Sequence, residues 1–233
     1  MVQGGRALDA PQSIRVRLAR WLAGGAMVLL SAAVAAADPT FTFVDLQPKA
    51  NHKLADDLHP DSEGNHLGAV PQGEQKLGDV RFKIGEKLIH LRGAHVPDLP
   101  EKVEGIKVDA TFDRLHVLHS TGYGEGSDPP LEDGTEIGAY VLRYADGTSA
   151  KMMIRYGEDL RDWWDWPDRT ELKRARVAWL GTNPAAEGNG RKVRLFSVVW
   201  DNPHPTKPVA TIDFLSNNTE CDPFLVALTL EKK

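Results

Sequence analysis

The sequence has little cysteine: Cys221 is the only one, so the chain can form no internal disulfide bond. Stability must therefore come from a packed core. We expect the Cys221 thiol to be buried; pairing between two chains is the alternative. The neighbouring carboxylates of Glu220 and Asp222 would raise the thiol pKa, so a catalytic cysteine is not expected.

The sequence also lacks an excess of positive charge, since its formal net charge is −5. Removal of a basic leader would make the remaining chain more acidic still. Nucleic acid and anionic membrane surfaces both require a basic face, so neither is expected as a partner. No apolar run after the leader is long enough for a transmembrane segment.

Residues 1–37 have the layout of a bacterial signal peptide. Four arginines lie from Arg6 to Arg20, and an apolar run follows from Trp21 to Val34. The small residues Ala35 and Ala37 then stand at positions −3 and −1 of the expected cleavage site. We expect cleavage after Ala37 rather than an uncleaved anchor helix, because the run is short and rich in small residues. The predicted location is secreted, periplasmic or at the bacterial cell surface.

The remaining chain, residues 38–233, reads as a single domain of about ten short strands separated by Gly and Pro turns. Asp146-Gly147 between two apolar runs is a strong hairpin signal. This pattern predicts an all-β sandwich or barrel. The expected strands are Phe41–Leu46, Val80–Ile84, Lys87–Arg92, Val103–Val108, Arg114–Ser120, Ile137–Tyr144, Ser149–Arg155, Arg176–Gly181, Lys192–Trp200, Ala210–Leu215 and Phe224–Glu231.

Three segments depart from the strand pattern. Gln47–Gln75 has little periodicity and is a long irregular segment, a kind that often carries function. Thr121–Ser127 is rich in glycine but lacks the Lys-Ser/Thr of a phosphate loop, so it is expected to be a mobile turn. Asp159–Trp164 is the best candidate for a helical turn.

Eight histidines raise the question of a metal site. His116 and His119 have an odd spacing, which places them on opposite faces of a strand. No zinc-ligand spacing is present, and His52, His59 and His66 lie in the irregular segment, where geometry cannot be inferred. A metal site is thus undetermined and no cofactor is expected.

Calcium is left open by an acidic loop that contains Asp128, Glu132 and Asp133, although the spacing of an EF-hand is missing.

No catalytic residue can be assigned from the sequence. There is no GxSxG motif. Four acidic residues could supply the carboxylate pair of a glycosidase, but such clusters arise by chance in a chain with 26 % charged residues. They are Glu158, Asp159, Asp162 and Asp165.

Tryptophans give the strongest hint of function. Trp163, Trp164 and Trp166 lie close together, and an exposed indole ring stacks well on the face of a sugar. Two of these rings are expected in the core and one at the surface. The predicted ligand-binding residues are Trp163, Trp164, Trp166, Arg161, Asp162, His119 and Tyr123.

Several segments together resemble a known domain type. They include Asp113-Arg-Leu-His-Val-Leu-His119, Tyr144-Ala-Asp-Gly147, Arg161-Asp-Trp-Trp164, Ala178-Trp-Leu-Gly-Thr-Asn183 and Trp200-Asp-Asn-Pro203. Phe41–Glu231 resembles secreted jelly-roll domains of planctomycete-type bacteria, which are similar to the galactose-binding-like sandwiches of carbohydrate-active enzymes. The resemblance implies a jelly-roll fold but no catalytic motif.

These observations favour an exported, non-catalytic carbohydrate-binding sandwich with a glycan or polysaccharide as partner. One alternative is a secreted hydrolase acting on polysaccharides, which needs two carboxylates in a cleft. Another is a structural or assembly module of the cell envelope, which needs a large exposed apolar patch. The oligomeric state is not predicted.

Overall fold

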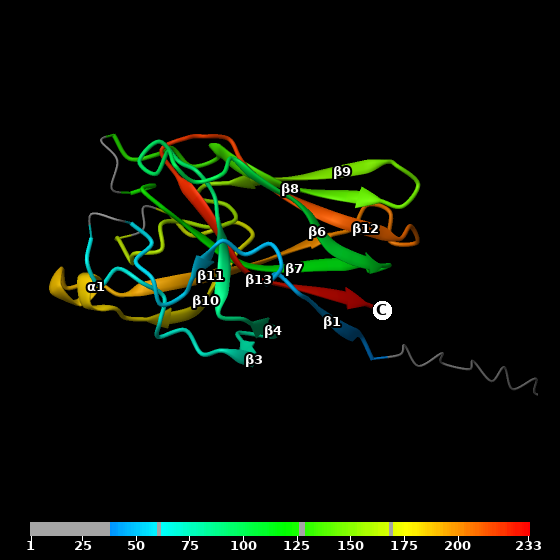
Figure 1. Cartoon of the computed structure of the whole chain (residues 1–233), viewed down its shortest axis with the longest axis horizontal. Helices are drawn as coiled ribbons and strands as arrows, with labels where there is room; N and C mark the ends of the chain where they lie inside the picture. Colours follow the sequence, from blue (N-terminus) through cyan, green and yellow to red (C-terminus); the bar gives the residue numbers. More distant parts are fainter. Residues whose placement is uncertain (1–37, 60–61, 126–128, 168–169) are drawn as a thin grey trace, which may run out of the picture. The chain divides into compact units, whose positions relative to one another are not determined.

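Antiparallel strands make up about half of the chain that the structure, a computed structural model, describes (Figure 1). The described residues are 38–59, 62–125, 129–167 and 170–233. They lie within one compact unit, Ala36–Lys233. The predicted signal peptide, residues 1–37, lies outside the described residues. Within the described part, no helix has the length and apolar character needed to cross a membrane.

The larger sheet is organised around two long strands that run side by side, β7 (Arg114–Gly122) and β13 (Asp222–Lys232) (Figure 1). Both are buried along most of their length. Its order is β10 (Arg176–Gly181), β11 (Val193–Asp201), β7 (Arg114–Gly122), β13 (Asp222–Lys232), β5 (Lys87–His90) and β2 (His52–Lys53), and β1 (Thr40–Val44) also pairs with β13.

A second sheet and a hairpin complete the strands. The Asp146-Gly147 turn joins two strands of the second sheet, as predicted, and Gly147 has a φ of 85° there. The sheet has the order β6 (Lys102–Ala110), β12 (Val209–Ser216), β8 (Glu136–Tyr144) and β9 (Ser149–Arg155). The hairpin consists of β3 (Gly73–Leu77) and β4 (Val80–Ile84).

Two apolar clusters explain why the strands of the larger sheet are buried on both faces. One cluster lies between the two sheets and joins Leu115 and Phe196 to Tyr140 and Phe214. The other joins the opposite face of the larger sheet to the irregular segment and the β3–β4 hairpin. A strand covered on both faces reads as a continuous apolar run, as β13 does.

The all-β class is confirmed, and the two packed sheets are consistent with a sandwich. The predicted helical turn at Asp159–Trp164 is wrong, because this segment forms isolated bridges to neighbouring strands. The helix of the described chain is α1 (Pro184–Gly188), where the Asn183 side chain caps the first turn and Pro184 begins it. Cys221 is fully buried, as expected.

Candidate functional site

A pocket of about 360 Å³ opens beside the tryptophan segment, and we call it the aromatic pocket. Indole and phenol rings share its wall with hydroxyl, amide, imidazole and carboxylate groups. The described residues that line it are His59, Ser62, Asn65, Tyr123, Asp162, Trp163, Trp164 and Trp166. Such a mixture of apolar rings and polar groups is typical of ligand sites.

Backbone hydrogen bonds hold the tryptophan segment between the ends of β7 and β11. Trp163 donates its backbone N–H to the carbonyl of Thr121, and its own carbonyl accepts from the N–H of Arg194. The Asp162 carboxylate accepts three further backbone N–H groups, those of Gly124, Glu125 and Trp164. The segment is therefore fixed by its backbone, which leaves the indole rings of Trp164 and Trp166 at the pocket.

Tyr123, in the Gly122-Tyr123-Gly124 turn, forms another wall of the pocket, while residues 126–127 of the predicted mobile turn lie outside the described residues. Tyr123 adopts a φ of 56°, which is uncommon for a residue with a side chain. Its ring lies 4.4 Å from the rings of both His59 and His95, measured between centroids. A Cβ atom at Gly122 would lie 2.5 Å from Asp222 Oδ1, so glycine is required there.

Behind His59 lies a buried histidine–aspartate cluster formed by His59, His90 and Asp222. The Nε2 atoms of both histidines lie 2.8 Å from the same carboxylate oxygen, Asp222 Oδ2. The other oxygen, Oδ1, accepts the backbone N–H of Gly122 at 2.7 Å. Asn51 fixes His90 in turn, because its side-chain amide makes two 2.8 Å hydrogen bonds with the His90 backbone.

A chain of hydrogen bonds joins this cluster to the aromatic pocket. Trp164 donates its indole N–H to Asn65 Oδ1 at 3.0 Å, so the Asn65 amide nitrogen must face His59 Nδ1, 3.2 Å away. His59 Nδ1 is then an acceptor. The proton of the neutral imidazole consequently sits on Nε2, where it is donated to Asp222.

Two buried carboxylates of the site have opposite pKa shifts. Burial opposes ionisation of Asp222, yet hydrogen bonds from His59 and His90 hold its pKa well below the ordinary value. Burial raises the pKa of Asp162 to about 7, although backbone N–H groups favour its charged form and the nearby Asp222 charge disfavours it. Asp222 is thus the anion at the centre of the cluster.

The structure brings five of the seven predicted binding residues to the pocket: Tyr123, Asp162, Trp163, Trp164 and Trp166. Trp163 is 1 % exposed and belongs to the core. Trp164 and Trp166 are half-buried and stack with 6.2 Å between their centroids. One ring is therefore in the core rather than the two expected.

Arg161 lies away from the pocket lining and is fully buried. Its guanidinium makes a two-pronged ion pair with Asp133 at 2.9 Å and contacts Glu125. Asp133 is thereby committed to Arg161, which counts against the calcium loop, while Asp128 lies outside the described residues. A partner role for Arg161 in ligand binding is not supported by this position.

His119 is also buried beneath the surface. Its ring bonds to the Tyr140 hydroxyl at 3.2 Å and to the Asp159 carbonyl at 3.1 Å. His116 instead bonds to Glu231, so the two histidines do point to different surroundings, as their odd spacing predicts. His119 is a core residue and cannot reach a ligand in the aromatic pocket.

Sequence reasoning missed the histidine–aspartate cluster because its members come from three distant segments. His59 lies in the irregular segment, His90 ends β5 and Asp222 begins β13. Pairing of β13 with both β5 and β7 places these strand ends together. The only local signal was the unusual length of the irregular segment, which also contributes Ser62 and Asn65.

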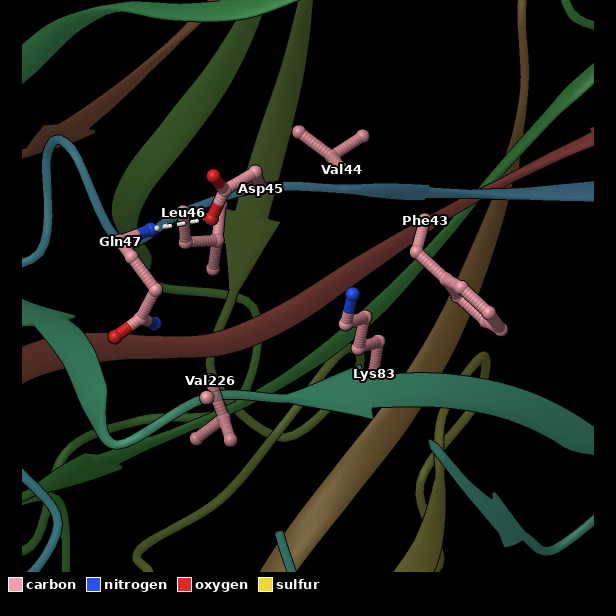
Figure 2. A pocket seen from close by; sticks show the side chains of 8 residues that line it. Phe43, Val44, Asp45, Leu46, Gln47, Lys83 and Val226 are labelled. Atoms are coloured by element: carbon pink, nitrogen blue, oxygen red, sulfur yellow. Dashed lines mark hydrogen bonds between the residues drawn. The ribbon is translucent and has the colours of Figure 1, made fainter. Parts of the chain in front are cut away.

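A second cavity, of about 370 Å³, lies between β1 and β4 (Figure 2). Its polar groups are mostly engaged: Asp45 Oδ1 accepts the backbone N–H of Gln47, and the Gln47 amide binds the main chain of Lys87. Apolar side chains such as Leu46 and Val226 form much of the rest. The aromatic pocket, with several polar groups that converge, is the better candidate site.

No protein-family model, curated protein or solved structure matches this chain. Its function has to be argued from the site itself.

Proposed function

We propose that this chain is an exported carbohydrate-binding module that holds a saccharide ring in the aromatic pocket. The observation that carries the proposal is the half-buried pair Trp164 and Trp166 beside polar side chains in one hollow. Indole rings pack against the apolar face of a sugar, while hydroxyl, amide and imidazole groups hydrogen-bond its hydroxyls. Ser62 brings a hydroxyl group to the lining of the same pocket.

Neighbouring side chains hold the rings of Trp164 and Trp166 in place, which lowers the entropic cost of binding. Asn65 accepts the Trp164 indole N–H and so fixes that ring. The Arg191 guanidinium lies over the Trp166 ring, 4.6 Å from its centroid, and helps to hold that ring in place. We further propose that the sandwich is of the jelly-roll, galactose-binding-like type and is secreted, periplasmic or displayed at the cell surface.

The hydrolase alternative has less support. Among the described lining residues the pocket has one carboxylate, Asp162, and backbone N–H groups occupy both of its oxygens. Asp159 binds Arg174, and Glu158 binds Lys173, so these two acids form ion pairs elsewhere. A glycosidase needs two carboxylates facing the same bond.

The structural-module alternative rests on four exposed apolar residues, two of which, Phe41 and Val199, line one small pocket. Phe41, Val177, Leu180 and Val199 are each between 40 % and 50 % exposed. A few partly exposed apolar side chains are ordinary on protein surfaces and do not by themselves mark an assembly face.

A screen of the purified protein against immobilised glycans and soluble polysaccharides tests the proposal. We expect retention on at least one of them, and loss of that retention in Trp166→Ala. Absence of retention on every glycan, or equal retention by the variant, would refute carbohydrate binding at this pocket.

A further inference from the structure

The histidine–aspartate cluster has the composition of a metal site. One nitrogen from each of His59 and His90 and one oxygen from Asp222 lie within 4.8 Å of one another. All three side chains are buried. Ligand atoms around a bound Zn²⁺ lie about 2.0–2.2 Å from the ion, so only small movements would bring these three atoms around one centre.

We propose that His59, His90 and Asp222 bind one divalent transition ion such as Zn²⁺. Two imidazoles and one carboxylate suit ions of this class, whereas Ca²⁺ and Mg²⁺ prefer oxygen ligands alone. Three protein ligands leave one position of a tetrahedral ion open. His59 also lines the aromatic pocket, so a bound ion would share this ligand with the wall of the proposed saccharide site.

The ion takes the place of the two protons that the imidazoles now donate to Asp222. Each histidine then binds the metal through Nε2 and carries its proton on Nδ1. For His90 this requires no rearrangement of a described neighbour, because no described residue is hydrogen-bonded to its buried Nδ1.

For His59 the change involves Asn65. A proton on His59 Nδ1 would face the Asn65 amide nitrogen, which also donates, so the amide must turn to present its oxygen. An amide or carboxylate oxygen behind a ligand histidine is the usual support of a metal site. The turn withdraws the acceptor from the Trp164 indole N–H, so metal binding is linked to the pocket rim.

Titration of the metal-free protein with Zn²⁺ by calorimetry, and with Co²⁺ by visible absorption, tests the site. We expect one ion per chain and a Co²⁺ spectrum without a thiolate band, since Cys221 is not a ligand. Binding should fall at least 100-fold in His90→Gln and in Asp222→Asn, and stay unchanged in His116→Gln. His116 is the matched control, because it is a buried histidine paired with a single carboxylate, Glu231.

No stoichiometric binding by the wild-type protein, equal binding by the ligand variants, or a thiolate band would overturn the proposal. The wild-type titration tests the proposal without any variant, so it remains informative even if His90→Gln or Asp222→Asn fails to fold. It also needs no glycan, so the metal site and the carbohydrate proposal fail separately.

Asn65→Asp tests the role given to Asn65. A carboxylate accepts from His59 Nδ1 without turning, so we expect Zn²⁺ to bind about tenfold more tightly than to the wild-type protein. Unchanged or weaker binding would contradict this role, since a residue that only packs would not raise metal affinity.

Discussion

At the scale of the residue, the site depends on a close approach that only glycine permits. The backbone N–H of Gly122 bonds to Asp222, and a Cβ atom there would meet both Asp222 and the His59 ring. The sequence showed a glycine-rich stretch at this place, yet its composition alone suggested a mobile turn. What composition could not reveal was the carboxylate that β13 brings against it.

Gly122→Ala should lower the free energy of unfolding by about 1–3 kcal/mol, because the new methyl group overpacks a buried site. Urea unfolding measures this. Gly188→Ala is the matched control: it has open space around it and lies in α1, so its stability should be equal or slightly higher. Equal effects of the two substitutions would contradict the packing described for Gly122.

His119 should give the fold a pH dependence. Burial lowers the pKa of His119 to about 4 in the folded protein, against about 6.5 in the unfolded chain. The unfolded chain therefore binds a proton first as the pH falls, so His119 costs stability between about pH 6.5 and pH 4, by up to about 3 kcal/mol.

Thermal melts from pH 7.5 to pH 4 of the wild-type protein and of His119→Gln measure this contribution. As the pH falls, the wild-type protein should lose more stability than His119→Gln. His204→Gln changes an exposed histidine and should follow the wild-type curve. Parallel curves for His119→Gln and the wild-type protein would mean that His119 does not titrate as its burial implies.

At the scale of the element, most strands could be predicted and the links between them could not. Val80–Ile84, Ser149–Arg155 and Arg176–Gly181 match β4, β9 and β10 in both bounds, because alternation and turn residues are local signals. β3 was missed because Glu74, Gln75 and Lys76 are polar, and only pairing with β4 makes that segment a strand. The short helix α1 lies between the expected strands Arg176–Gly181 and Lys192–Trp200, where no helix was predicted.

The tryptophan segment could likewise be predicted only in part. Its residues were found from the sequence, but their division into one core ring and two rim rings depends on the bridges to Thr121 and Val193. Arg161 was assigned to the ligand as a polar partner beside the tryptophans, although a charged side chain can instead be buried when it is paired. Here it is a buried cation that links the side chains of Glu125 and Asp133 to the segment that follows β9.

Arg161→Gln should lower the free energy of unfolding by about 3–5 kcal/mol, because it leaves the carboxylates of Asp133 and Glu125 without their buried partner. Chemical denaturation measures the loss. Arg155→Gln is the control, since its ion pair with Glu136 is largely exposed to solvent and should contribute less than about 1 kcal/mol. A small effect at Arg161 would show that this network does not hold the loop.

At the scale of the whole molecule, the two faces of the larger sheet support different parts of the structure. One face packs against the second sheet and forms the core of the sandwich. The other face supports the irregular segment and Trp163, and this layer carries His59 and Asn65 to the aromatic pocket. The tryptophan side of the pocket could be predicted from the sequence, but the layer and the histidine–aspartate cluster could not, because contacts between distant segments create both.

Equilibrium titration of the best-retained glycan tests carbohydrate binding most directly. We expect Trp166→Ala to weaken binding about tenfold or more, which corresponds to the loss of about 1.4 kcal/mol of stacking. Trp179→Ala, which removes a half-buried tryptophan outside the pocket lining, should bind as the wild-type protein does. Equal affinity of Trp166→Ala and the wild-type protein for that glycan would contradict a saccharide site in the aromatic pocket.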